Sequence, residues 1–280
     1  MSNIKIVTDS SCDLPVDLAA EKGITVVPLA IRFGEEELFD RLDLSPKEFW
    51  ARCAASPVLP ETAAPSPGSF EQVFREAHKE GFDGVVCINL SSKLSATRDS
   101  AVAGAKAVQG EIPVNVVDSL SVTMGLGMIV LEAARAAAAG SDLEEVTAIA
   151  IDSAKRTRVY GTLDTLENLK KGGRIGKAQS LLGSLLSIKP IIEVQDGAVE
   201  PGPKQRTRAR AFSWLAEQVK ARPSVDEVAV IHGEAPDVDK LISLLAPQVP
   251  RERVIVADLG AVIGTHAGPR CVGVAFQVKG

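Results

Sequence analysis

The sequence predicts an α/β protein made of two α/β domains. Over the first 155 residues, short apolar strand patterns alternate with helix patterns, which indicates a mostly parallel sheet covered on both faces. Beyond that point the pattern changes to short strands, a hairpin signal and short helices, which favours an α+β unit with a mixed sheet. We therefore expect an N-terminal domain over residues 1–155 and a C-terminal domain over residues 156–280, each of ordinary domain size.

The elements of the first domain follow from apolar periodicity and capping residues. Strands are expected at 4–7, 24–31, 85–88 and 114–117, and helices at 14–22, 44–55, 68–80, from 101 onward and at 125–139. Asp13, Ser45 and Ser66 each precede a helix pattern as cap, with Pro46 and Pro67 at first helical positions. Residues 58–67 read as a proline-rich loop.

The second domain shows shorter elements. Strands are expected at 159–163, 191–194, 198–200, 228–231, 254–258 and 272–278, and helices at 164–171, 178–188, 207–220 and 237–245. Asp196-Gly197 between two of these strands is a hairpin signal. Residues 262–263 lead into a glycine-rich loop that contains His266.

The composition limits the class of protein. Hydrophobic residues make up 45% of the chain and aromatic residues 4%, so the core is built from aliphatic side chains. The net charge is −5 without a long basic run, which disfavours nucleic acid as a partner. The four cysteines show no CxxC spacing, which disfavours zinc and disulfides and suits a reducing compartment. With no signal-peptide pattern and no apolar run of about 18 residues, we expect a soluble cytoplasmic protein.

The segment from Asp83 to Ser100 is the clearest candidate for binding. An apolar strand ends in a loop rich in hydroxyls and a helix pattern begins at once. The first amides of a helix lack intrahelical partners and the helix dipole favours negative charge, so this junction can hold an anion. It has neither the glycines of a dinucleotide site nor the lysine of a P-loop.

Other chemistry has weaker support. A Ser/His/Asp hydrolase lacks its Gly-x-Ser-x-Gly turn. The glycine-rich run from Gly172 to Lys177 follows a helix rather than a strand, and it is either a helix stop with solvated cations or an anion-contacting loop that presents Arg174 and Lys177. Asp9 and Asp118 could hold Mg²⁺, but we expect them to bond local backbone amides.

Single histidine and threonine residues give weaker indications of function. The glycines around His266 suggest close approach of the backbone to another group. We expect His78 to be exposed, whereas His232 is ambiguous. Thr62 on its own is a turn hydroxyl.

Together, the motifs of this chain resemble those of the DegV family. They are TDSSCDLP near residue 8, TAAPSPGSF from Thr62, LSSKLSAT from Leu90, VDSLSVTMGLG from Val117, LKKGGRI from Leu169, KPII from Lys189, RTRARA from Arg206 and VIGTHAGP from Val262. Each is weak alone, but together they follow the family's order along nearly the whole chain. The departures are Ala63-Ala64 where the family often has Ser-Gln, Ala96 where it often has glycine, and Arg270 in place of a usual glycine.

The resemblance implies a bacterial fatty-acid carrier without catalysis of its own. Two α/β domains would bury an acyl chain such as palmitate or oleate between them. The carboxylate would be held by Thr62 and Ser95, with Ser92, Arg174 and His266 as secondary head-group candidates. The implied partner is a fatty-acid kinase that forms an acyl phosphate; transient membrane contact stays open, and no cofactor, metal or catalytic residue is expected.

Two other functions are open on the sequence. The alternative to a carrier is an enzyme: a serine-dependent esterase or lipid hydrolase, or a small-molecule kinase acting alone. A lipid-responsive regulator would need a DNA-binding element, and none is visible in the sequence.

Overall fold

The structure is a computed structural model that describes residues 2–222, 225 and 227–278. Its first sheet has the strand order β2-β1-β6-β7 and is parallel throughout. The strands are β1 (Ile4–Asp9), β2 (Thr25–Val27), β6 (Gly84–Asn89) and β7 (Val114–Asp118). The predicted parallel sheet is confirmed.

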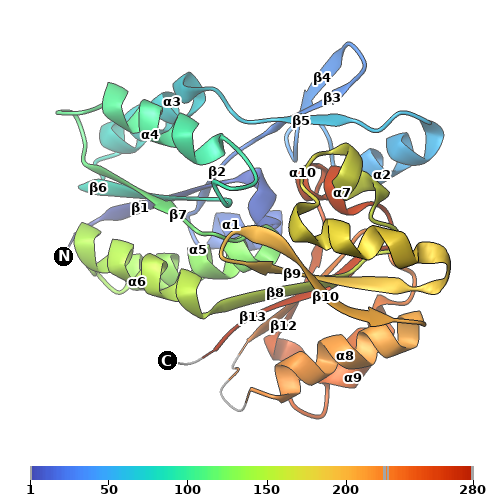
Figure 1. Cartoon of the computed structure of the whole chain (residues 1–280). Coiled ribbons are helices and arrows are strands. Elements are labelled where there is room, and N and C mark those ends of the chain that lie inside the picture. The colour runs from blue at the N-terminus through green and yellow to red at the C-terminus, as the bar shows by residue number, and fades with distance from the viewer. Residues whose placement is uncertain (1, 223–224, 226, 279–280) are drawn as a thin grey trace.

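Helices cover both faces of this sheet (Figure 1). On one face lie α3 (Pro67–Lys79) and α4 (Thr97–Ala107), and on the other α5 (Thr123–Ala138) and α6 (Leu143–Arg156). A 3-10 turn, η1 (Ser10–Cys12), and the short helix α1 (Val16–Glu21) follow the first strand. Ser66 caps α3 with Pro67 at the first helical position, as predicted.

The second sheet is mixed, as predicted, with the order β10-β9-β8-β13-β11-β12. Its strands are β8 (Thr157–Thr162), β9 (Lys189–Gln195), β10 (Ala198–Gln205), β11 (Val228–His232), β12 (Val254–Asp258) and β13 (Val272–Gln277). β11 and β12 pair in parallel and the neighbouring pairs are antiparallel. Asp196 and Gly197 both have positive φ, 49° and 81°, which is the conformation that the Asp-Gly hairpin signal predicted.

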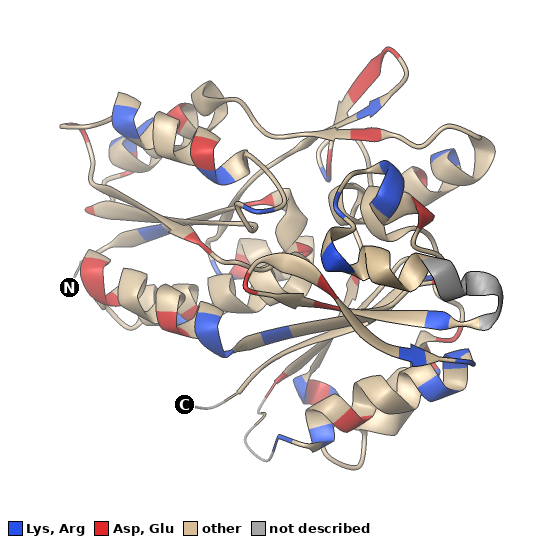
Figure 2. Cartoon of the chain, in the orientation of Figure 1, with Lys and Arg blue, Asp and Glu red and all other residues tan. Residues whose placement is uncertain are grey.

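One helix lies between the two sheets. α5 contacts β1 and β6 on one side and β8, β11 and β13 on the other, while α8 (Arg208–Lys220) and α9 (Val238–Leu245) cover the far face of the mixed sheet (Figure 1). The core therefore runs without a break from the first sheet through α5 to the second. Most of the charged residues lie on the outer helices and loops (Figure 2). The domain boundary near residue 155 stays a prediction.

A third, small sheet differs from the prediction. β3 (Ala30–Phe33) pairs with β4 (Glu36–Phe39) and with β5 (Glu61–Ala63), all antiparallel. The single strand expected at 24–31 is therefore split between two sheets at Pro28, which has no N–H to donate to a ladder. Thr62 lies on β5 rather than in a loop. The helix predicted at 44–55 is confirmed as α2 (Pro46–Ala55). Its N-terminus is closed by a capping box in which Ser45 takes part.

The remaining helices are short. They are α7 (Glu167–Lys171), the 3-10 segments η2 (Gly176–Ser187) and η3 (Arg251–Arg253), and α10 (Ala261–Ala267). The segment 178–188 was expected to be α-helical and is 3-10 instead. His266 lies on α10, where the sequence predicted a loop. The first amides of α10 bond to distant carboxylates: Gly260 N to Asp13 Oδ1 at 2.9 Å and Ala261 N to Asp40 Oδ1 at 3.2 Å.

Candidate functional site

Thr62, Ser95, Arg174 and His266 line one cavity of about 200 Å³. The other lining residues are aliphatic: Leu29, Ala63, Ala64, Leu90, Leu94, Ala96, Val122, Leu169, Ile192, Val194, Val199, Val262, Ile263 and Ala267. The walls come from both halves of the chain. The cavity thus combines a few polar groups with an apolar interior, which is the usual make-up of a small-molecule site.

Thr62 and His266 meet although 204 residues separate them. Pairing with β3 places Thr62 on β5, and α10 brings His266 Nε2 to 3.1 Å from Thr62 Oγ1. Burial lowers the pKa of His266 to about 4, and the charge of Arg174 adds to the shift. The imidazole is therefore neutral near pH 7.

The surroundings of the ring indicate its tautomer. His266 Nδ1 is buried without a hydrogen-bond partner among the described residues, close to the backbone of Gly172. A proton on Nδ1 would be a buried donor without an acceptor, so we assign the proton to Nε2. Nε2 then donates to Thr62 Oγ1, and the Thr62 hydroxyl proton stays free for a ligand.

Ser95 lies two residues before α4, which begins at Thr97 after the N-cap Ala96. Its Oγ is 2.9 Å from Thr97 Oγ1 and accepts from Thr97 N at 3.3 Å. With the Thr97 hydroxyl as donor, Ser95 can turn its own proton toward the cavity. The positive end of the α4 dipole favours negative charge at this position.

Arg174 lies in the cavity wall, and its guanidinium is hydrogen-bonded to two backbone carbonyls. Its Nε donates to Leu94 O at 3.1 Å and its Nη1 to Gly172 O at 2.6 Å. Lys177, from the same glycine-rich run, instead pairs with Glu200 at 2.9 Å and is largely exposed. Of the two cations expected in an anion-contacting loop, Arg174 lines the cavity and Lys177 does not, and contact of this run with an anion stays a prediction.

Ser92 lies outside the cavity lining. It is exposed, its Oγ donates to Asp118 Oδ2 at 2.5 Å, and its N donates to Asp118 Oδ1 at 3.2 Å. We therefore leave Ser92 out of the head-group set. Asp118 also accepts from Leu120 N, and Asp9 accepts from Ser11 N and Leu90 N, so both aspartates bond backbone amides as predicted.

Two further candidates are accounted for. His78 is exposed on α3, as predicted. The ambiguous His232 lies at the end of β11, with its Nε2 3.6 Å from Asp258 Oδ1. Within the part of the chain that the structure describes, no group of three or more His, Cys, Asp or Glu residues is placed to hold a metal ion.

A second, smaller cavity of about 80 Å³ adjoins the first. Both are lined by Val122, Ile192, Val194, Ile263 and Ala267. Sequence reasoning missed these residues, because aliphatic side chains on strands and helices carry the same pattern whether they face a cavity or a packed core.

The whole chain has relatives among known proteins. Residues 3–279 match the model of a family described as uncharacterised proteins of the DegV family. The chain belongs to the DegV family. A DegV domain-containing protein of Streptomyces coelicolor is 37% identical over 282 residues, which cover 99% of each chain.

Solved structures of other proteins share this fold closely. A fatty-acid-binding DegV family protein from Thermus thermophilus is 34% identical, with a TM-score of 0.91 over 99% of this chain and 100% of that one. A stearic acid-binding protein from Eubacterium ventriosum is 27% identical, with a TM-score of 0.83 over 99% and 98%.

The structure accommodates the residues at which this chain departs from the usual DegV pattern. Ala96 has φ −79°, which alanine adopts without strain, so it leaves the backbone beside Ser95 undisturbed. Ala63 and Ala64 add methyl groups to the cavity lining. Arg270, at a position that is often glycine, has φ 60° and pairs with Asp164 at 3.4 Å, outside the cavity.

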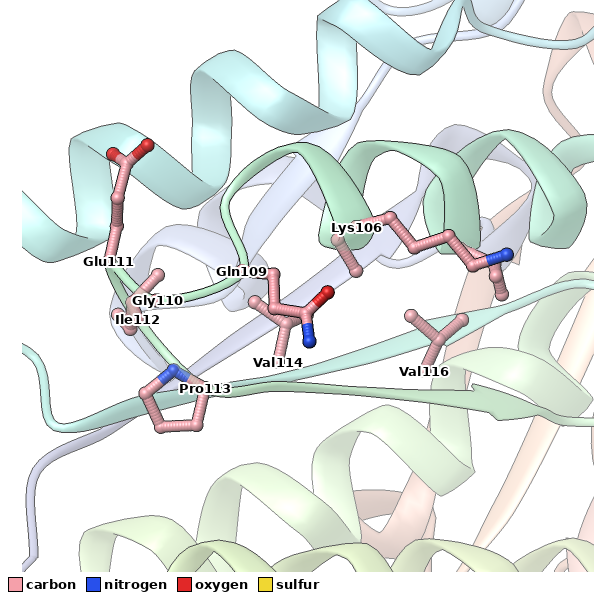
Figure 3. Close-up of a pocket in the computed structure, with 10 residues that line it drawn as sticks. Lys106, Gln109, Gly110, Glu111, Ile112, Pro113, Val114 and Val116 are labelled. Carbon is pink, nitrogen blue, oxygen red and sulfur yellow. The ribbon is translucent and has the colours of Figure 1, made fainter.

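A larger hollow of about 660 Å³ lies elsewhere, between α4 and the edge strand β7 (Figure 3). Lys106 from the helix, Gln109 from the turn that follows it, and Val114 and Val116 from the strand border it. None of the predicted head-group residues lines it, so we do not treat it as the ligand site. Within residues 2–222, 225 and 227–278, no helix is both long and apolar enough to cross a bilayer.

Proposed function

We propose that this protein binds a long-chain fatty acid, with the carboxylate against Thr62 and Ser95 and the acyl chain in the two adjoining cavities. The observation that carries the proposal is the lining itself: hydroxyls, a neutral imidazole and one guanidinium, with aliphatic walls elsewhere. The description of two proteins with this fold as fatty-acid-binding and stearic acid-binding supports it.

The energetics suit such a ligand. A saturated sixteen-carbon acid has about 14 methylenes, and burial contributes roughly 0.8 kcal/mol for each, on the order of 11 kcal/mol before the costs of association. The chain therefore supplies most of the affinity. The head group has to be oriented and kept hydrogen-bonded, because an unpaired buried carboxylate is costly.

The proposed donors suit that task. The Thr62 hydroxyl, oriented by His266, and the Ser95 hydroxyl, oriented by Thr97, each offer one proton. Arg174 adds positive charge from the wall while its Nε and Nη1 remain bonded to carbonyls. Such a site holds a carboxylate without a tight bidentate ion pair, which would hinder later transfer.

We further propose that the bound acid is presented to a partner kinase. Thr62 and Ser95 are partly exposed, and the neighbouring Ala63 and Ala96 are exposed, so the head-group end faces solvent. A kinase docked there could transfer a phosphoryl group from a nucleotide to the carboxylate and form an acyl phosphate. This chain itself would act as a carrier.

The esterase alternative has less support from the geometry. His266 contacts Thr62, whereas the side-chain hydrogen bonds of Ser95 in the described structure go to Thr97. No carboxylate orients the ring, because Nδ1 has no partner among the described residues. A serine nucleophile needs a base in contact and a group that orients that base.

Substitution of the two hydroxyls tests the head-group assignment. Thr62→Ala with Ser95→Ala should weaken palmitate binding at least about tenfold, since a hydrogen bond to a charged group contributes roughly 1.5–3 kcal/mol. Titration of the purified, delipidated protein with palmitate measures the change. Ser92→Ala removes a hydroxyl from the same loop but outside the cavity, and it should bind palmitate as the wild type does.

Equal affinity of the double variant and the wild type would refute the assignment. Turnover of a p-nitrophenyl ester by the wild type, lost in Ser95→Ala, would favour the esterase instead.

A further inference from the structure

Two glycines face each other across the middle of the mixed sheet. Gly161 on β8 pairs in register with Gly273 on β13. The row continues outward to Ile192 on β9 and to Ile231 on β11. With strands about 4.8 Å apart, roughly 14 Å of sheet lies between the two isoleucines, and its middle carries no side chain.

The glycine pair lies on the face that is turned toward α5. Val159 on β8 and Leu163 just beyond its end alternate with Tyr160 and Thr162 and lie on the same side as Gly161; they belong to the core that contains α5, whereas Tyr160 belongs to the core under α8 and α9. On β13, the two valines that flank Gly273 likewise face α8 and α9. A side chain at position 161 would therefore point toward α5.

Space remains above the pair. Gly161 and Gly273 are partly exposed although they lie on inner strands, while their neighbours Tyr160, Thr162, Val272 and Val274 are all buried. The accessible surface belongs to the cavity of about 80 Å³ that adjoins the head-group cavity. None of Thr62, Ser95, Arg174 and His266 lines this smaller cavity, so it is the end remote from the carboxylate.

We infer that the Gly161–Gly273 pair forms the seat of the acyl tail and sets the longest chain that the protein accepts. The inference rests on the proposed function and adds to it a specificity-determining position. A chain anchored at Thr62 and Ser95 passes Ile192 and Val194, which border both cavities, and ends over the glycines. A short acyl chain ends before it reaches the two glycines. A long acyl chain needs the space above them.

Gly161 is the position at which the inference can be tested. A Cβ there would lie 3.8 Å from Val272 O and 3.9 Å from Ile192 Cγ1, which are ordinary contacts. A Cβ at Gly273 would lie 2.8 Å from Tyr160 O and would strain the sheet. Gly161→Ala and Gly161→Val therefore add volume to the tail seat with least disturbance of the backbone.

The experiment measures the affinities of saturated fatty acids of ten to eighteen carbons for the delipidated wild type and variants. Each methylene kept out of the cavity should weaken binding about fourfold. We expect Gly161→Val to leave decanoate within about twofold and to weaken stearate at least about tenfold. Gly161→Ala should lie between it and the wild type. Gly68→Ala adds a methyl group to exposed α3, where its Cβ lies 3.6 Å from Ser66 Oγ, and should keep the wild-type profile.

The outcomes separate the two claims. An unchanged dependence on chain length in Gly161→Val, or an equal loss for every length in a folded Gly161→Ala, overturns the tail seat and leaves fatty-acid binding standing. A wild type that binds no fatty acid of any length overturns the proposed function itself. Circular dichroism and thermal melting establish that each variant is folded, and Gly161→Ala decides the question if Gly161→Val does not fold.

Discussion

At the residue scale, the contact between Thr62 and His266 decides what the site can do. A neutral ring that donates through Nε2 fixes the direction of the Thr62 hydroxyl, and that hydroxyl can then donate to an anion. A protonated ring would carry an additional N–H on Nδ1, which has no acceptor nearby among the described residues. Because Nε2 keeps its proton in either state, the burial of Nδ1 sets the charge of the ring, whereas the contact through Nε2 orients the Thr62 hydroxyl.

The lowered pKa of His266 predicts a pH dependence of stability. The folded-state pKa is about 4 and the ordinary value is 6.5, so between these values the unfolded chain binds the extra proton. The stability associated with the neutral ring is complete above about pH 6.5 and is lost as the pH falls toward 4, by about 3 kcal/mol in all. Asp40 acts in the opposite direction, because burial raises its pKa to about 6 and the folded state then holds the extra proton.

The contribution of His266 is isolated by comparing the wild type with His266→Gln. Urea titrations give the free energy of unfolding of each protein. Between pH 7 and pH 4 the wild type should lose about 3 kcal/mol more of this free energy than His266→Gln. His78→Gln changes an exposed histidine and should show no such trend. A difference that is constant with pH would mean that the ring is not buried in its neutral form.

The sequence predicted which polar residues line the cavity, but it did not predict the contacts that these residues make. Family motifs pointed to Thr62, Ser95, Arg174 and His266, and all four line the cavity. The same motifs suggested Ser92, whose hydroxyl is bonded to Asp118. That bond joins residues 26 positions apart, so the local sequence around Ser92 does not contain the information that directs the side chain outward.

At the scale of elements, the errors of prediction share one cause. β5 has three residues and exists through its pairing with β3, some thirty residues earlier. The seven-residue helix α10 is glycine-rich, and its first amides find acceptors on Asp13 and Asp40, more than 200 residues away. Longer elements with local caps, such as α2 and α3, were predicted with nearly correct bounds.

A buried ion network holds α10 in place. Arg41 Nη2 donates to Asp13 Oδ1 at 2.9 Å and to Asp258 O at 3.1 Å, and both aspartates that contact α10 lie beside this guanidinium. Burial raises the pKa values of Asp13 and Asp40, and Arg41 opposes both shifts. The cation therefore favours the ionised form of both buried carboxyl groups, which is the stronger acceptor for the amides of α10.

Removal of this cation should be costly. We expect Arg41→Met to lower the free energy of unfolding by about 3–5 kcal/mol near pH 7, because buried carboxylates lose their partner. Chemical denaturation gives the value. Arg32→Met removes the cation of an exposed pair with Glu37 and should cost far less than Arg41→Met. Similar losses in the two variants would show that the network does not stabilise α10.

At the scale of the whole molecule, the site exists because two halves of the chain share one core. β5 and the loop before α4 bring the hydroxyls from the first half, and α10 and β9 bring the imidazole and the aliphatic walls from the second (Figure 1). The fold class, the parallel first sheet and the mixed second sheet followed from the sequence. The course of the cavity did not, because it depends on where aliphatic residues and glycines from different strands leave space, and no local pattern records that.

The proposed ligand of this cavity is a long-chain fatty acid. The most direct test is mass spectrometry of the lipid extracted from the protein purified from a bacterial host without added lipid. We expect fatty acids of about sixteen to eighteen carbons at close to one per protein molecule, and a clear reduction in the Thr62→Ala, Ser95→Ala double variant. Protein that carries no acyl chain and whose melting temperature does not change with palmitate or oleate would contradict the claim.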